Sequence, residues 1–154
     1  MRPARETDSI AIEPATPRDL AEVRALLERH DLPLDDVEAH VQTMVVARDQ
    51  ADVVGVAALE VYTDGALLRS VAVDAAVQGR GLGHRLTEVT LDMARRHGVK
   101  TVFLLTTTAD RFFQKFGFEQ VTRADVPASV QASVEFRSAC PASAIVMRKH
   151  VSAP

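Results

Sequence analysis

Apolar residues recur at helical spacing in two stretches of the chain, and each stretch has the residues typical of a helix end. The first stripe consists of Leu20, Val23 and Leu27. Thr16 supplies an N-cap and Pro17 suits the first helical position, so the pattern predicts a helix over Pro17–Arg29. The second stripe consists of Leu82, Leu86, Val89 and Met93. It stops at Gly98, which is typical of a helix C-terminus, and it predicts the best-defined helix of the chain.

Shorter apolar runs between polar turns predict strands. These runs are Ile10–Ile12, Met44–Ala47, Val53–Tyr62, Leu67–Val73, Thr101–Thr106, Phe118–Val121 and Ala144–Met147. A polar connection of hairpin length follows Met44–Ala47, and Asp64-Gly65 supplies hairpin turn chemistry after Tyr62, so three consecutive strands are expected to be antiparallel. The continuous apolar run Thr101–Thr106 is typical of a strand that is buried on both faces.

Three further segments have weaker patterns. Pro33 interrupts the chain after the first helix, and Asp35–Val41 is predicted as a second, short helix. Ala109–Phe116 is predicted as a short aromatic helix. The polar stretch Thr122–Pro141 gives no clear prediction.

The predicted elements alternate between a hairpin meander and one strand–helix–strand crossover. This order indicates an α+β (mixed α/β) fold, with a central mixed, mostly antiparallel sheet flanked by helices in a single domain over residues 9–151. Residues 1–8 are expected to be a flexible N-terminus. The crossover makes Leu67–Val73 and Thr101–Thr106 parallel neighbours, and its helix begins at the carboxyl end of a strand, where ligands commonly bind.

The composition narrows the class of protein. The chain has 154 residues, of which 47% are hydrophobic and 25% charged, with a net charge of −3, as in one soluble globular domain. Without a Lys/Arg cluster, nucleic acid is not expected as a partner. No apolar run approaches the ~20 residues of a membrane span, and residues 1–8 do not resemble a signal peptide. The single cysteine favours the reducing cytoplasm. The cysteine and histidine residues do not have the spacing of a zinc site, so no metal site is expected.

A glycine-rich segment lies at the predicted strand–helix junction. It reads Gln78-Gly79-Arg80-Gly81-Leu82-Gly83-His84. Glycines allow the backbone to approach a ligand, and the free N–H groups of a first helical turn favour an anion such as a pyrophosphate. The segment lacks the Gly-Lys-Ser/Thr of a Walker loop, and His84 stands where the dinucleotide fingerprint needs glycine. The alternative is a turn that only packs a helix on a sheet.

Two motifs resemble those of the GCN5-related N-acetyltransferases. Gln78, Gly81 and Gly83 match the hallmark Gln/Arg-x-x-Gly-x-Gly/Ala, and Phe112–Phe118 is similar to the second motif, an aromatic helix that ends in Gly-Phe. The resemblance covers Met44 to Met147 and implies acetyl-CoA as the cofactor. It implies that the chain contacts acetyl-CoA through Val71, Ala72, Val73, Gln78, Gly79, Arg80, Gly81, Leu82, Gly83 and His84. It also implies a splay between Val71–Val73 and Leu104–Thr106.

A closer likeness concerns the acceptor. Leu67–Val73, Leu104–Ala109 and Cys140–Ala144 resemble the small acetyltransferases encoded with arsenic-resistance operons, which are similar in turn to the acetylating domain of N-acetylglutamate synthase. The likeness implies an N-acetyltransferase that acts on a small-molecule amine, either an amino acid or an amino-acid-like toxicant. Dimers are common among such relatives, so a homodimer is possible. The alternatives are a catalytically silent acyl-CoA-binding or sensing module and a protein N-terminal acetyltransferase.

The chemistry requires a neutral amine, so a base near the acceptor is useful. Glu60, in the strand next to the cofactor strand, is the candidate catalytic residue, acting directly or through water; the alternative is a solvated strand residue. The family often has a tyrosine that protonates the leaving thiolate, but Phe113 stands at that position, and Tyr62 cannot be assumed to replace it. A thiol with a pKa of about 8.5 leaves tolerably well, so direct transfer is favoured.

Three residues are candidates for substrate binding. Arg69 lies in a mostly apolar strand and would pair with a carboxylate, phosphonate or arsinate of the acceptor, unless strand alternation points it to solvent. Thr107 follows a buried strand and would hydrogen-bond an acceptor, although β propensity also explains threonines there. The glutamate-synthase likeness places a substrate-contacting serine at Ser143. Cys140 is read as a small hydrophobe rather than a nucleophile.

Overall fold

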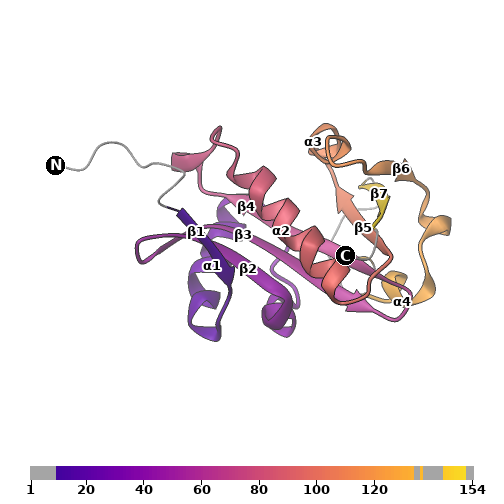
Figure 1. The fold of residues 1–154 in the computed structure, drawn as a ribbon, viewed down its shortest axis with the longest axis horizontal. Helices are drawn as coiled ribbons and strands as arrows, with labels where there is room; N and C mark the ends of the chain where they lie inside the picture. Colours follow the sequence, from indigo (N-terminus) through magenta and orange to yellow (C-terminus); the bar gives the residue numbers. More distant parts are fainter. Residues whose placement is uncertain (1–9, 134–135, 137–143, 152–154) are drawn as a thin grey trace.

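Seven strands form one mixed sheet in the computed structural model, which describes residues 10–133, 136 and 144–151 (Figure 1). The sheet order is β1-β2-β3-β4-β5-β7-β6, with β4 and β5 parallel and the other neighbours antiparallel. The strands are β1 (Ile10–Pro14), β2 (Met44–Asp49), β3 (Asp52–Tyr62), β4 (Gly65–Val73), β5 (Thr101–Thr106), β6 (Glu119–Val121) and β7 (Ile145–His150). The predicted fold class and the parallel crossover are confirmed.

The helices cover both faces of this sheet. The α-helices are α1 (Leu20–Arg29), α2 (Leu82–Arg96), α3 (Asp110–Gln114) and α4 (Ala128–Gln131). The 3-10 helices are η2 (Pro17–Asp19), η3 (Val37–Thr43), η4 (Ala75–Val77) and η5 (Arg123–Asp125). None of the helices in the described ranges is both long and apolar enough to span a membrane.

Strand alternation divides the core between the two faces. On β2, Val46 packs in a cluster with Val23 and Leu27 of α1, whereas Val45 packs with Leu86 of α2. Farther along the sheet, the C-terminal half of α2 and the phenylalanines of α3 cover one face of β4, β5 and β7. Residues of α4, together with Phe136, cover the other face. The core of β5 is therefore buried on both sides, as its apolar run predicts.

Several boundaries differ from the predicted ones. The predicted first helix begins with the 3-10 turn η2, and α1 follows it directly. A capping box between Thr16 and Asp19 forms the N-terminus of η2. The short helix predicted at Asp35–Val41 is the 3-10 segment η3. Strand β7 continues beyond Met147 to His150, because β5 offers it a pairing partner along its whole length. Helices η5 and α4 form within the stretch that gave no clear prediction.

Strands β4 and β5 stay paired only over a short length. Their register joins Ala66 to Val102 and Leu67 to Phe103, and no further pair follows. On the other side of β4, the register with β3 shifts between Val56 and Ala58, and Ser70 has a φ of +60°. A bulge of this kind bends a strand and increases its twist. The carboxyl end of β4 therefore leaves β5, and the sheet opens at this point.

A partly buried ion pair ties β2 to the start of α1. Arg48 Nη1 and Nη2 donate to Asp19 Oδ1 and Oδ2 at 3.0 and 3.1 Å, and Arg48 also pairs with Glu13. Asp19 is 4% exposed. The hydrogen bonds from Arg48 lower the pKa of the Asp19 carboxyl below its usual value, against the opposing effect of burial.

Replacement of this arginine tests the pair. Arg48→Met leaves the Asp19 carboxylate buried without its bidentate partner, so we expect the free energy of unfolding to fall by about 3 kcal/mol at pH 7. Because the folded-state pKa of Asp19 is lowered, its contribution is complete above the usual value of 3.8 and is lost as the pH falls through the folded-state pKa. Urea unfolding at pH 7 and pH 3 measures both; an equal loss at both pH values would contradict the assignment.

Candidate active site

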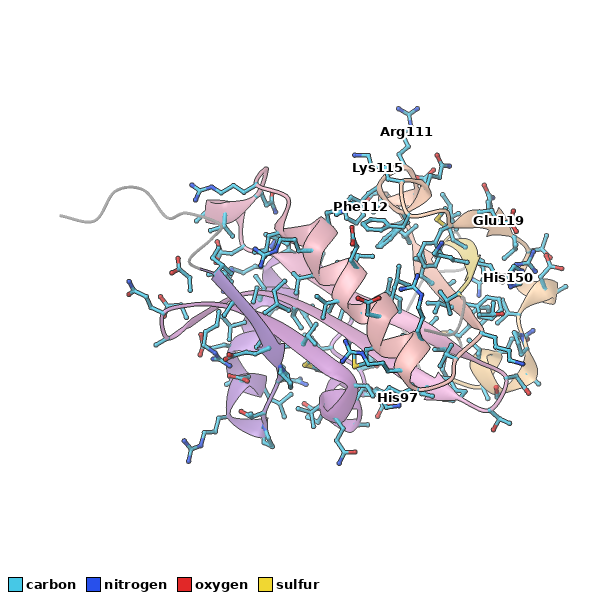
Figure 2. All side chains as sticks on the ribbon, in the orientation of Figure 1. His97, Arg111, Phe112, Lys115, Glu119 and His150 are labelled. Atoms are coloured by element: carbon cyan, nitrogen blue, oxygen red, sulfur yellow. The ribbon has the colours of Figure 1, made fainter. Side chains whose placement is uncertain are left out.

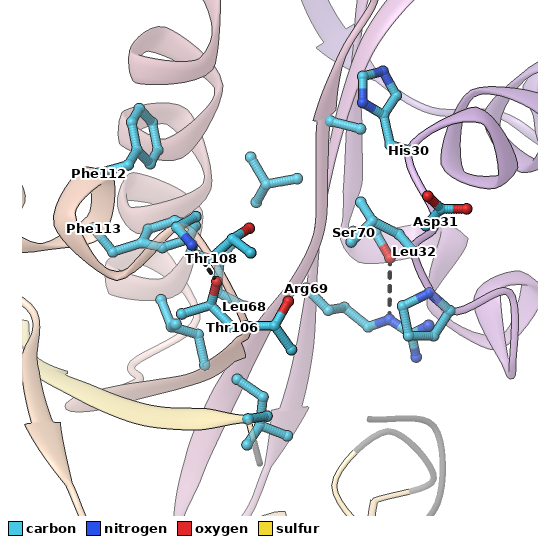
Figure 3. A pocket seen from close by; sticks show the side chains of 18 of the residues that line it. His30, Asp31, Leu32, Leu68, Arg69, Ser70, Thr106, Thr108, Phe112 and Phe113 are labelled. Carbon is cyan, nitrogen blue, oxygen red and sulfur yellow. Dashed lines mark hydrogen bonds between the residues drawn. The ribbon is translucent and has the colours of Figure 1, made fainter. Parts of the chain in front are cut away.

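A cavity of about 360 Å³ occupies the opening between β4 and β5. This volume falls within the range of small-molecule sites. Its walls are the carboxyl half of β4, the end of β5 with the residues that follow, the phenylalanines of α3, and the turn after α1. Figure 3 shows Phe112 and Phe113 at one side of the cavity and His30 and Asp31 at the other. The cavity therefore reaches from the α3 side of the sheet to the α1 side.

The backbone of β4 has polar groups directed at the opening. Asp74 N donates to Val54 O of β3 at 2.8 Å. Because neighbouring residues of an extended strand direct their backbone groups to opposite edges, the N–H and C=O of Val73 point away from β3. The side chain of Gln78 already uses one of them, since its Nε2 donates to Val73 O at 3.0 Å. Ala72 pairs with Val56, so only its side chain faces the cavity.

The glycine segment forms the turn into α2. Gly79 and Gly81 have φ values of +82° and +79°, and a Cβ added at either would meet no atom within 4 Å. The first backbone bond of α2 runs from Arg85 N to Gly81 O, so the N–H groups of residues 82–84 have no partner within the helix. The first turn contains no acidic residue. The segment thus presents backbone donors and the positive end of the helix dipole to an open surface.

The side chains of this segment differ in their positions. Leu82 is buried, so only its backbone faces outward. Arg80 is exposed on the loop. The His84 ring packs against Phe116, with 4.6 Å between ring centroids, and forms an ion pair with Glu88. Gly83 lies close to Phe112, because a Cβ added at Gly83 would be 3.6 Å from the Phe112 ring. The glycine segment and α3, which carry the two motifs, are therefore neighbours.

Glu60 is fully buried, which makes the solvated interpretation wrong. Its carboxylate accepts hydrogen bonds from Arg69 Nη1 at 2.7 Å and from the Tyr62 hydroxyl, and His40 Nε2 lies 3.3 Å away. It is not among the residues that line the cavity. Burial, followed by the hydrogen bond to Glu60, raises the pKa of Tyr62, and the phenol also lies outside the lining. The carboxylate touches the cavity only through Arg69.

Arg69 is 3% exposed and lines the cavity, so the solvent-facing alternative is wrong for it as well. Glu60 pairs with Leu67 and Ala58 with Arg69, which makes Glu60 and Arg69 diagonal neighbours across β3 and β4. The guanidinium also donates to Ser70 Oγ at 3.1 Å (Figure 3). It donates to Asp35 O at 2.8 Å as well. These contacts fix a positive charge on the α1 side of the opening.

The other candidates lie at the rim or outside the described residues. Thr107 is exposed and lines the cavity, while the hydroxyl of Thr106 accepts from Ala109 N at 2.9 Å and so caps the turn into α3. Phe113 is buried and lines the cavity with an apolar ring. Ser143 and Cys140 lie outside the described residues.

The turn after α1 supplies lining residues that the sequence does not single out. They are His30, Asp31, Leu32 and Pro33. Asp31 has a φ of +55°, an uncommon backbone conformation for a residue other than glycine. A proline and a histidine after a helix indicate only a turn, and no local pattern brings that turn to β4. The site therefore has two sides, one with backbone donors and one with Arg69.

Comparisons with known proteins agree on one family. Residues 40–120 match the family model described as "Acetyltransferase (GNAT) domain". The chain is 34% identical over 134 residues to a Mycobacterium tuberculosis protein named "Amino-acid acetyltransferase", with 84% of this chain and 74% of the relative covered. It is 28% identical to an uncharacterized N-acetyltransferase of Chlorobaculum tepidum, with 84% of this chain and 81% of the relative covered.

Solved structures share the fold. N-acetylglutamate synthase from Neisseria gonorrhoeae, complexed with coenzyme A and N-acetyl-glutamate, aligns with a TM-score of 0.80 at 22% identity over 93% of this chain. The chain spans only 35% of the length of that protein. A Mycobacterium tuberculosis protein in complex with CoA aligns with a TM-score of 0.78 at 24% identity, over 92% of this chain and 99% of that one.

The Glu60–Arg69 pair makes a testable prediction about stability. Glu60→Leu leaves the Arg69 guanidinium buried without its carboxylate, so the free energy of unfolding should fall by about 3–5 kcal/mol. The double variant Glu60→Leu/Arg69→Met removes both charges and should recover most of that loss. Urea unfolding of both variants measures the effect. A double variant that is no more stable than Glu60→Leu would contradict a direct coupling between the two side chains.

Proposed function

Because the chain belongs to the GNAT acetyltransferase family, we propose that it transfers the acetyl group of acetyl-CoA directly to the amine of an amino acid or an amino-acid-like compound. One observation carries the proposal: a single cavity crosses the sheet from α3, whose Phe112 lies beside Gly83, to the buried guanidinium of Arg69. Such a cavity allows a donor and an acceptor to enter from opposite sides and meet at the opening between β4 and β5.

The donor side fits coenzyme A. Acetyl-CoA supplies an activated thioester, and the chain's own groups bind and orient it. Backbone donors of the turn from Gln78 to His84 suit a pyrophosphate, because Gly79 and Gly81 leave the outer surface of the turn open. The edge of β4 at Val71–Val73, left without a strand partner beyond Leu67, suits the amides of a pantetheine arm. Two solved relatives of this fold are described as complexes with coenzyme A.

The acceptor side fits an amine that also bears an acidic group. Arg69 is a buried cation at the cavity wall, and a guanidinium binds a carboxylate, phosphonate or arsinate with two hydrogen bonds. Thr107 at the rim adds a hydroxyl, and Ser143 remains part of the proposal. Glu60 holds Arg69 and is proposed as a positioning residue. The relative with an amino-acid name and the synthase complex with N-acetyl-glutamate support this acceptor class.

Direct transfer agrees with the side chains at the opening. Phe112 and Phe113 have no group that forms a covalent acetyl intermediate, and the Phe113 ring cannot protonate the leaving thiolate. A thiolate is a tolerable leaving group, so water is a sufficient proton donor for it. We propose that the transferase domain spans residues 9–151 and that the protein forms a homodimer. The cytoplasm is the proposed compartment, because one cysteine in 154 residues suits reducing conditions.

The proposed activity is tested by release of free thiol from acetyl-CoA over a panel of acceptors. The panel contains glutamate, glutamine, other amino acids, phosphinothricin-like compounds, polyamines and short peptides. We expect turnover with at least one amino acid or amino-acid-like acid and none with polyamines, which cannot pair with Arg69. Tight coenzyme A binding without turnover would favour a sensing module instead. Activity on peptides alone would favour a protein N-terminal acetyltransferase.

The glycine segment gives a sharper test of the donor side. Gly81→Glu projects a carboxylate from the outer surface of the turn toward the space assigned to the pyrophosphate. Like charges repel, so we expect the dissociation constant for coenzyme A to rise by at least about 100-fold in calorimetry.

Gly81→Ala is the matched control for this prediction. It imposes the same strain at a φ of +79° without the charge, so it should weaken binding far less. If Gly81→Glu binds coenzyme A as tightly as Gly81→Ala, the pyrophosphate does not lie at this turn.

A further inference from the structure

The cavity contains few groups that can accept a proton. Among the described lining residues, the ionisable side chains are His30, Asp31 and Arg69. The guanidinium of an arginine stays protonated and cannot serve as a base. Glu60 is outside the lining and is already hydrogen-bonded to Arg69 and Tyr62. An acceptor that enters as an ammonium ion must lose a proton before its nitrogen can attack a carbonyl, so the choice narrows to His30 and Asp31.

His30 occupies the side of the cavity where the acceptor is proposed to enter. It ends α1, where its backbone N–H donates to Leu27 O at 3.1 Å. Figure 3 shows His30 with Asp31 on the same side as Leu32, across the cavity from Phe112 and Phe113. Helix α1 packs on the sheet face opposite to α2, whose first turn carries the proposed pyrophosphate site. A base at the position of His30 would therefore face the incoming amine rather than the nucleotide part of acetyl-CoA.

The ring of His30 lines the cavity and differs in its contacts from the rings of His40, His84 and His150. His40 and His84 are paired with carboxylates, and His150 Nδ1 lies 3.2 Å from Thr101 Oγ1. Within the ranges that the structure describes, the half-buried His30 ring forms no hydrogen bond or ion pair. A ring without a committed partner, at a cavity wall, is available to a ligand.

Chemistry favours the imidazole over the neighbouring carboxylate. An imidazole is in general a stronger base than a carboxylate, so it takes a proton from an alkylammonium ion at a smaller cost in free energy. A base works best when its pKa lies close to the working pH. Asp31 is exposed at the mouth and suits attraction of a cation instead.

We propose that His30 is the general base for the acceptor, and that Asp31 attracts the ammonium group beside it. The neutral ring takes one proton from the ammonium, directly or through one water, and passes it to solvent. The neutral nitrogen then forms the C–N bond as the C–S bond breaks, and the second proton lost from nitrogen reaches the leaving thiolate through water. This inference rests on the proposed function and adds the residue that prepares the amine.

The test compares two acceptors that differ in whether they need a base. One is the best amino acid from the panel; the other is its α-aminooxy analogue, whose nitrogen is neutral at pH 7. His30→Gln keeps a polar side chain without basicity. We expect kcat/KM for the amino acid to fall by at least about 100-fold and that for the aminooxy acid to change by less than about 5-fold. His97→Gln is the control, because His97 is exposed at the end of α2 and well separated from Phe112 (Figure 2).

A measurement without turnover addresses the same contact. In the wild-type protein, the imidazole NMR resonances of His30 should shift when the amino acid is added with coenzyme A, while those of His97 stay unchanged. His30→Gln should bind coenzyme A with the wild-type dissociation constant, which shows that the variant is folded and that the donor side is intact.

Different failures have different meanings in these experiments. A wild-type protein that turns over no amino acid would overturn the proposed function itself. A wild-type protein that acetylates the amino acid while His30→Gln loses little activity, or loses equally on both acceptors, would overturn the role of His30 and leave the proposed function in place. An unshifted His30 resonance at saturating acceptor would also overturn it.

Discussion

The parting of β4 and β5 after two residue pairs is the constraint on which the rest of the site depends. A central strand normally satisfies its backbone groups on both edges, and an open edge in the middle of a sheet leaves donors and acceptors exposed. The bulge opposite β3 and the positive φ of Ser70 bend β4 away, so the opening is part of the architecture. Because helices pack on both faces around it, the opening becomes a cavity that crosses the sheet.

A second constraint is the buried charge at this opening. Arg69 and Glu60 are 3% and 0% exposed, and a pair so placed is maintained only when its hydrogen bonds are satisfied. Tyr62, Ser70 and the carbonyl of Asp35 provide those contacts. The pair holds a guanidinium at the cavity wall in a fixed direction, which favours an acidic acceptor. The same packing keeps Glu60 out of the cavity lining, and the proposed general base is therefore His30, on the turn after α1.

Local sequence patterns predicted α2 and the glycine segment, the two elements proposed to bind coenzyme A. Helix α2 has a regular apolar stripe and ends before Gly98, whose φ is +75°, and the glycine segment has the positive φ values that only glycine adopts easily. Contacts across the sheet were less predictable. Whether Glu60 faces solvent or core depends on the register of β3 with β4 and on what covers that face, and neither is encoded near Glu60. In the stretch before β7, Val126 and Val130 pack in one cluster with Phe103 and Val146, a surface that exists only after the sheet has assembled.

The sequence by itself determined the order of the strands, the crossover between β4 and β5 and the position of the glycine turn, because each follows from patterns within short segments. Tertiary structure decided which side chains share the cavity. His30 and Arg69 are 39 positions apart in the chain and line one cavity because α1 packs on the face of β4 from which Arg69 projects. That packing depends on burial summed over many residues, so no short segment contains it.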